Sequence, residues 1–393
     1  MAEVLLASKA RAGAAMVRIG EAQAWPQVVS RAGVWRVVPQ LSERVTSMEA
    51  ELPCPEAFPL RRAAIEAFGK SAFRMAKGVE AIRALERCGI RVAAFKGLAA
   101  IAILYGSPRR RSLGDADLII SEDQLGAALA CLAAAGFERR SGESFAQYVR
   151  FVENAPGFAG NRAVALHGPG DSEIDLHWEL GSSGLTNPEL LDRAVPVVLG
   201  GATVPVVHPV DAFLLSAHHT VRDNFSVESS VRDLADLQLL CPLVAAAGGD
   251  LELARRAGSA GLLAPVIAVT KILEEFDPRE AVCAVAATVR QAATRGQLRA
   301  AKGLSEAFRY QLESGSLNRD LLYLVHPQPF RQILTGMWRD RAGYRESRQA
   351  VEETLGRDHS LAHRAASLAR ALGTWRGLRV ARGLARAKFG SSL

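Results

Sequence analysis

The stretch that decides the fold is residues 95–120, FKGLAAIAILYGSPRRRSLGDADLII. An apolar run over 90–95 predicts a short strand that leads into a turn, and a helix is predicted over 98–105. After a polar, basic loop, a second strand is predicted over 115–120. A strand, a turn, a helix and a second strand in so short a segment are typical of an α+β core.

The second strand opens with two acids, Asp115 and Asp117, on either side of Ala116. Because side chains alternate along a strand, the two carboxylates should point the same way and Ala116 into the core. Neighbouring carboxylates repel each other unless a cation lies between them, and Mg²⁺ with a triphosphate is the commonest such case. By itself the pattern is more often a solvated strand end than a metal site, and both interpretations remain open at this point.

A third acid lies in residues 174–180, IDLHWEL, where apolar and polar residues alternate strictly. If this strand lies beside 115–120, Asp175 adds a third carboxylate to the same site. Three acids that hold two cations suit in-line phosphoryl chemistry. His177 shares the polar face, either as a partner of a metal-binding acid or as a buried histidine with internal hydrogen bonds.

Basic residues and a glycine precede the acids. Gly97 would let the backbone approach a ligand closely, Lys96 would add positive charge, and the helix that follows would offer free amides to phosphate. Arg111, four residues before Asp115, could clamp a phosphate with two hydrogen bonds. For Arg109 and Arg110 a phosphate contact and a solvated basic loop are both open.

Together these motifs resemble the bacterial family of uncharacterised nucleotidyltransferases over roughly residues 15–245. Members carry a lysine-glycine turn, an arginine shortly before an Asp-x-Asp pair, and a later Asp-Leu-His-Trp strand. The chain departs from the wider nucleotidyltransferase superfamily in one respect, because its Lys96-Gly97 turn replaces the usual Gly-Ser.

The resemblance implies transfer of a nucleoside monophosphate from an NTP, with ATP expected, to an acceptor hydroxyl or phosphate. It assigns catalysis and the binding of Mg²⁺ or Mn²⁺ to Asp115, Asp117 and Asp175, and the triphosphate side to Lys96, Gly97 and Arg111. The acceptor would be a peptide, a saccharide or a small molecule. Two alternatives stay open: kinase-type phosphoryl transfer from the same site, and a non-enzymatic scaffold that retains the fold.

The expected fold class is α+β, with a small mixed β-sheet of nucleotidyltransferase type embedded in a large α-helical protein. The predicted organisation is a helical region over 1–88, a catalytic core over 89–207, a helical lobe over 208–356 and a basic tail over 357–393. Further strands are predicted over 146–152, 162–166 and 173–180, and helices over 58–88, 122–135, 209–221, 228–240, 251–257, 262–276, 278–294, 298–313 and 330–355.

The net charge of +7 is located in the tail, where residues 357–393 hold eight basic residues and one acid. The charge therefore says nothing about the catalytic core. The tail would either pack on the body or bind an anionic partner, and its removal should leave NTP binding intact. No apolar run is long enough for a transmembrane segment and the N-terminus lacks a signal-peptide pattern, so a cytoplasmic location is expected.

Five cysteines are scattered through the chain without a paired spacing. They are expected to be reduced, buried thiols rather than zinc ligands or disulfides. For the acids, Asp117→Asn is expected to lower activity by orders of magnitude with little loss of stability, and the metal-free protein is expected to gain slightly in stability, since a like-charge pair is relieved.

Overall fold

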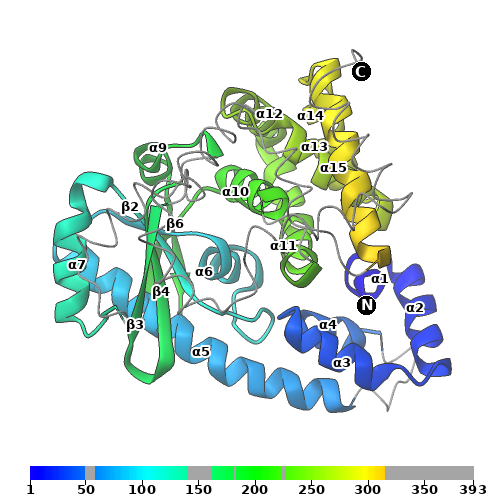
Figure 1. Ribbon diagram of the computed structural model, residues 1–393, viewed down its shortest axis with the longest axis horizontal. Helices are drawn as coiled ribbons and strands as arrows, with labels where there is room; N and C mark the ends of the chain where they lie inside the picture. Colours follow the sequence, from blue (N-terminus) through cyan, green and yellow to red (C-terminus); the bar gives the residue numbers. More distant parts are fainter. Residues whose placement is uncertain (49–57, 140–161, 181–182, 223–226, 315–393) are drawn as a thin grey trace, which may run out of the picture.

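The structure is a computed structural model, and it describes residues 1–48, 58–139, 162–180, 183–222 and 227–314 (Figure 1). The strand predicted over 146–152, the helix predicted over 330–355 and the basic tail lie outside the described residues.

One six-stranded mixed sheet carries the strands in the order β3-β4-β2-β1-β6-β5. Parallel pairs (β2 with β4, β1 with β6) alternate with antiparallel pairs (β3 with β4, β1 with β2, β5 with β6). This sheet within a mostly helical chain confirms the α+β prediction. The strands are β1 (Val92–Ala94), β2 (Ala116–Ile120), β3 (Arg162–Gly168), β4 (Ser172–Glu179), β5 (Val195–Leu199) and β6 (Ala202–Val206).

Helices surround the sheet, and the helices predicted over 209–313 are present with ends shifted by a few residues. The described helices are α1 (Ala2–Leu6), α2 (Lys9–Glu21), α3 (Trp25–Val34), α4 (Val38–Thr46), α5 (Phe58–Arg87), α6 (Lys96–Ala100), the π-helix η2 (Ile101–Tyr105), the 3₁₀ helix η3 (Glu122–Gln124), α7 (Leu125–Ala134), η5 (Pro169–Asp171), α9 (Asn187–Asp192), α10 (Pro209–Arg222), α11 (Val227–Ala245), η7 (Ala246–Gly248), α12 (Gly249–Ser259), α13 (Leu263–Phe276), α14 (Glu280–Gln291) and α15 (Arg295–Ser314).

The hairpin β5–β6 was not predicted from the sequence. Pro196 and Pro205 lie opposite each other in it, and proline argues against a strand when only the sequence is read. The turn is made by Gly200 and Gly201, whose φ angles of 57° and 76° lie in the left-handed region that such tight hairpins require. The hairpin extends the sheet beyond β1 and so completes it.

Helix α5 crosses the sheet and contacts β1, β2, β4 and β6 (Figure 1). Its close approach depends on Gly78, where a Cβ atom would lie 2.9 Å from the Cβ of Ala116. Ala116 therefore faces α5, as the sequence predicted. Because side chains alternate along β2, Asp115 and Asp117 face the opposite side of the sheet.

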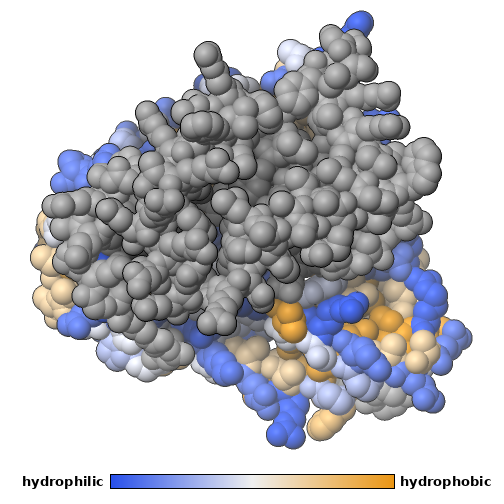
Figure 2. All heavy atoms as spheres, viewed as in Figure 1, coloured by the Kyte–Doolittle hydropathy of each residue, from blue (hydrophilic) through white to orange (hydrophobic). Residues whose placement is uncertain are grey.

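The N-terminal helices are packed against the C-terminal lobe. Helix α1 contacts α11, and Gln238 donates a hydrogen bond of 2.9 Å to the carbonyl of Leu6. A hydrophobic core runs from Leu6 and α5 through the sheet to α15, and a second cluster fills the space among the N-terminal helices. On the face shown in Figure 2, these helices present hydrophilic and hydrophobic side chains side by side.

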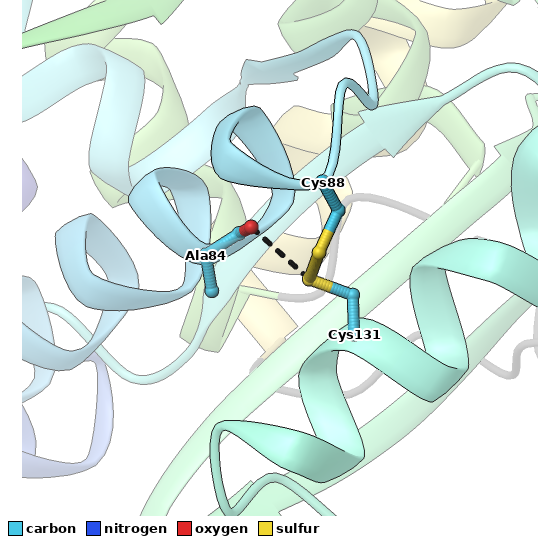
Figure 3. The surroundings of a disulfide bond; sticks show 3 residues. All are labelled: Ala84, Cys88 and Cys131. Carbon is cyan, nitrogen blue, oxygen red and sulfur yellow. Dashed lines mark hydrogen bonds between the residues drawn. A yellow bond between two sulfur atoms is a disulfide. The ribbon is translucent and has the colours of Figure 1, made fainter.

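The prediction that all cysteines are free is wrong for one pair, because a disulfide joins Cys88 at the end of α5 to Cys131 in α7 (Figure 3). The two Cα atoms are 6.6 Å apart, and the Cys131 sulfur lies 3.0 Å from the carbonyl oxygen of Ala84. Cysteines 43 positions apart in sequence meet only because α5 and α7 pack together, which no local spacing reveals. Cys241 and Cys283 are free.

In the described part of the chain, no single helix combines the length and apolarity needed to cross a membrane. One sharply bent pair, Ser230–Ala245 with Gly249–Ser259, meets that test only when its two helices are counted together.

Candidate active site

Strand pairing brings two of the predicted acids together. Strands β2 and β4 run parallel with Asp117 directly opposite Asp175, so both carboxylates leave the same face of the sheet. Oxygen atoms of these two acids and a ring nitrogen of His177 lie within 4.8 Å of one another. Asp115, at the entry to β2, lies outside this compact group but close enough for its charge to act on Asp175.

Asp117 is the buried centre of the site, with 2% of its surface exposed. Its Oδ1 accepts a hydrogen bond of 2.6 Å from Lys96 Nζ and lies 3.0 Å from His177 Nε2. Burial alone would raise the pKa of Asp117, but the Lys96 charge and the hydrogen bond to His177 outweigh it and hold that pKa well below its usual value. Asp117 is therefore a permanent anion.

Lys96 reaches Asp117 from an unusual backbone conformation. Its φ of 48° is left-handed, which costs energy for a residue with a side chain, and its ammonium lies 5.0 Å from the centroid of the Phe95 ring. The Phe95 amide donates a 3.1 Å hydrogen bond to the carbonyl of Asp117, which fixes the turn against β2. The strain of this turn is thus compensated by two contacts with the same acid.

His177 combines the two interpretations that the sequence left open. It is buried, with 1% of its surface exposed, and it contacts a predicted metal-binding acid. Its ring meets Phe95 edge to face at 4.8 Å. Its carbonyl accepts a 3.2 Å hydrogen bond from the Asn187 side chain, which also donates to the carbonyl of Ile120 at 2.8 Å. The imidazole is therefore held rigidly against Asp117.

The other two acids are electrostatically strained. Burial and the charges of Asp117 and Asp115 raise the pKa of Asp175 to about 7. Burial and the charge of Asp117 also raise the pKa of Asp115. Lys96, joined at Asp115 by Arg232 and Arg36, offsets only part of the effect of burial and like charge, so the pKa values of both acids stay raised.

This donor set fits a hard divalent cation. Carboxylate oxygens are the ligands that Mg²⁺ and Mn²⁺ prefer, and a cation would neutralise the repulsion that raises the pKa of Asp175. Asp117 and Asp175 would hold it, and His177 would orient Asp117 or serve as a ligand itself.

Arg111 is engaged by a carboxylate inside the protein. It is 3% exposed, and its guanidinium forms a bidentate ion pair with Asp236 of α11, with Nη2 2.7 Å from Oδ2. Its Nη1 donates to the carbonyl of Ser112 at 3.0 Å, and Asp236 also accepts a 2.8 Å hydrogen bond from the Tyr105 hydroxyl. This is the geometry of an internal tie between the loop and the helical lobe.

Gly97 is required by packing. A Cβ atom there would lie 2.8 Å from Cδ1 of Leu113 and 3.0 Å from Nη1 of Arg111. The neighbouring arginines also have partners, since Arg109 lies over the Phe68 ring at 4.7 Å and Arg110 forms an ion pair with Glu43 at 2.7 Å. The predicted basic loop is thus docked on α5 and α4.

Two basic residues near the acids were missed as site residues. The charges of Arg36, which follows α3, and Arg232, in α11, both act on Asp115. From the sequence alone Arg232 looks like a partner of Asp233, and Arg36 belongs to the helical lead-in over 36–41 that forms part of the family resemblance. No local pattern places either residue beside the acids, because Arg36, after α3, and Arg232, in α11, are both distant from them in the chain.

A match to a nucleotidyltransferase family model places the protein among the transferases of phosphorus-containing groups. The chain belongs to the family of uncharacterised nucleotidyltransferases, whose family model matches residues 21–277. This confirms the resemblance that the motifs predicted, and it implies an NTP substrate.

Among solved structures, the chain is similar to an antigenic nucleotidyltransferase-like protein from Paracoccidioides brasiliensis. The identity is 19% and the TM-score 0.28, and the match covers 44% of this chain and 78% of the other. No curated protein matches the chain.

Proposed function

We propose that the protein transfers a nucleoside monophosphate from an NTP, with ATP as the expected donor, to an acceptor hydroxyl or phosphate and releases pyrophosphate. The observation that carries this proposal is the in-register pairing of Asp117 with Asp175 on parallel strands, with Lys96 and His177 on Asp117. The bound Mg²⁺ or Mn²⁺ would supply charge neutralisation at the attacking and leaving oxygens.

Each acid has a separate part in this proposal. Asp117, a permanent anion, is the principal metal ligand, and Asp115 and Asp175 complete the set. Burial and like charges raise the pKa of Asp175 to about 7. Asp175 is therefore the acid suited to orient or deprotonate the acceptor.

The positive side of the site is proposed to bind the triphosphate. Lys96, whose Nζ is 2.6 Å from Asp117, would exchange that contact for a phosphate oxygen when the donor binds. Gly97 keeps the turn close to Leu113 and so holds Lys96 in place. Arg111 acts through its ion pair with Asp236 and fixes the loop that leads to Asp115.

The acceptor is proposed to be a peptide, a saccharide or a small molecule, and the location to be the cytoplasm, where NTPs are available. In a reducing compartment Cys88 and Cys131 would exist as thiols, and the Cys131 thiol could then donate to the Ala84 carbonyl at 3.0 Å.

The test uses ATP labelled at the α- or the γ-phosphate, with Mg²⁺ and with an extract of small molecules and peptides as the acceptor source. Label transferred from the α-position, with pyrophosphate released, supports the proposal. Transfer of the γ-label shows a kinase, and no transfer with either label, together with no ATP binding, shows a scaffold. Lys96→Ala should weaken ATP binding as well as reduce turnover.

A further inference from the structure

Arg36 brings a cation from the N-terminal helices to the loop that carries the acids. A Cβ atom at Gly114 would collide with Nη1 of Arg36 and would lie 3.1 Å from its Cζ. Gly114 immediately precedes Asp115, so the guanidinium lies against the backbone at the entry to the carboxylate cluster. A residue far from the cluster in sequence is therefore next to it in space.

The backbone of Arg36 is strained in the same way as that of Lys96. In the part of the chain that the structure describes, only three residues other than glycine have a positive φ: Gln23, Arg36 and Lys96, at 50°, 53° and 48°. Two of these are basic residues whose charges act on the acids. Such strain is unfavourable and persists where the surrounding structure or the function requires it.

No internal partner explains the position of Arg36. Within the described ranges, its guanidinium makes no hydrogen bond and no ion pair, and the residue is exposed. The neighbouring arginines of the 109–111 loop are all engaged, by a ring or by a carboxylate. The site therefore has an arginine fork beside Asp115 that no side chain of the described residues engages.

Arg232 supplies a second cation from the helical lobe. It lies one helical turn before Asp236 on α11, on the face that receives Arg111. Its Nε is buried and donates no hydrogen bond, and the nearest carboxylate oxygen, of Asp233, is 3.5 Å away. Asp233 is itself engaged by His219 at 3.1 Å. A buried donor without an acceptor is costly unless a ligand completes it.

We infer that Arg36 and Arg232 hold the phosphate groups of the substrate, the part that the sequence assigned to Arg111. The inference rests on the proposed function and adds to it that the triphosphate lies between α11 and the segment that follows α3, on the positive side of the carboxylate cluster. Arginine forks are suited to this because they bind phosphate with two parallel hydrogen bonds. The N-terminal helices are then part of the active site.

The experiment measures binding to the full-length chain by calorimetry, with Mg²⁺ alone, Mg²⁺ with inorganic tripolyphosphate, and Mg²⁺ with ATP as probes. Arg36→Gly removes the guanidinium and also the strain, since glycine adopts a positive φ freely. We expect affinity for tripolyphosphate and for ATP to fall about tenfold or more, as for loss of a charge-assisted hydrogen bond. Mg²⁺ alone should bind as tightly as before or more tightly, because a positive charge beside Asp115 is gone.

Gln23→Gly is the matched control, because it relieves the same backbone strain at an exposed, uncharged residue. Both glycine variants should have a melting temperature equal to or above that of the natural chain. Only Arg36→Gly should lose affinity for tripolyphosphate. Arg36→Lys should restore part of the affinity. Arg232→Gln should weaken both phosphate probes, and Arg255→Gln, at an exposed position on α12, should not.

The outcomes separate the two proposals. If the natural chain binds neither tripolyphosphate nor ATP, the proposed function fails. If it binds both and the Arg36 and Arg232 variants bind equally well, the inference alone is overturned. A loss of ATP affinity without loss of tripolyphosphate would overturn the phosphate assignment, and an equal loss for Mg²⁺ alone would show that the arginines act on the metal site instead.

Discussion

Asp117 and Asp175 lie opposite each other on β2 and β4 yet differ in electrostatic state. Lys96 and His177 stabilise the charge of Asp117, whereas burial and like charges oppose the charge of Asp175. The expected gain in stability from removing a like charge therefore belongs to Asp175, and removal of the charge at Asp117 should have a cost.

Asp117→Asn should reduce transfer by orders of magnitude and also lower the free energy of unfolding by about 1–3 kcal/mol, because a buried ion pair with Lys96 is lost. The measurements are pyrophosphate release and thermal melting of the metal-free protein. Normal turnover in this variant would remove Asp117 from the catalytic site.

Asp175→Asn should make the metal-free protein more stable above neutral pH. A carboxyl whose folded-state pKa is raised, here from 3.8 to about 7, stabilises the fold below its unfolded pKa and loses this contribution as pH rises through about 7. Each unit of pKa corresponds to about 1.4 kcal/mol.

In a chelator, the melting temperature of the natural chain relative to that of the Asp175→Asn variant should therefore be lower at about pH 8 than at about pH 5. Mg²⁺ should restore most of the difference, more strongly at the higher pH because no proton then has to be displaced. A difference in melting temperature that does not change with pH would contradict the raised pKa.

Among the elements, α5 determines where the acids lie, because Gly78 brings the helix into contact with Ala116 between them. Gly78→Val should cost about 1–3 kcal/mol through overpacking and should reduce activity by displacing β2. Gly69 offers a control on the same helix, since a Cβ atom there would meet nothing within 4 Å. Gly69→Ala should raise stability by about 0.5–1 kcal/mol, and equal effects at the two positions would refute this packing.

The disulfide joins two helices whose cysteines are 43 positions apart. In an oxidising buffer Cys88→Ser should lower the free energy of unfolding by about 3–4 kcal/mol, chiefly because the unfolded chain loses a constraint. A reductant should have the same effect on the natural chain. Cys283→Ser, at a free cysteine, is the control. It should change neither the free energy of unfolding in the oxidising buffer nor the effect of the reductant.

For the whole molecule, the Arg111–Asp236 pair links the loop that precedes β2 to helix α11. Arg111→Met should destabilise the protein by about 3–5 kcal/mol, since Asp236 would remain as a buried, unpaired charge. The double variant Arg111→Met/Asp236→Leu should recover much of this, although the Tyr105 hydroxyl loses its acceptor.

The double variant also distinguishes an internal tie from a phosphate clamp. If Arg111 only links the two parts of the chain, the stable double variant should bind ATP with nearly the affinity of the natural chain. A stable double variant that no longer binds ATP would show that Arg111 contacts phosphate after all.

The sequence determined the carboxylate site because that information is local. Strict alternation in 174–180 and in 115–120 specifies which side chains share a face, and it predicted the strands and the acids that the parallel register of β2 and β4 brings together. The same local logic predicted the helices of the C-terminal lobe from their apolar periodicity.

Only the tertiary structure decided the partners of the charges. Arg111 pairs with Asp236, Arg36 lies against Gly114, and Cys88 meets Cys131, each across a separation that no periodic pattern records. A charge is attracted by whichever opposite charge the packing brings near, and the strength of this attraction depends on how deeply the pair is buried. Local spacing determines the face on which a residue lies but not what lies opposite that face. The packed molecule therefore decides which arginine has a partner and which has none among the described residues.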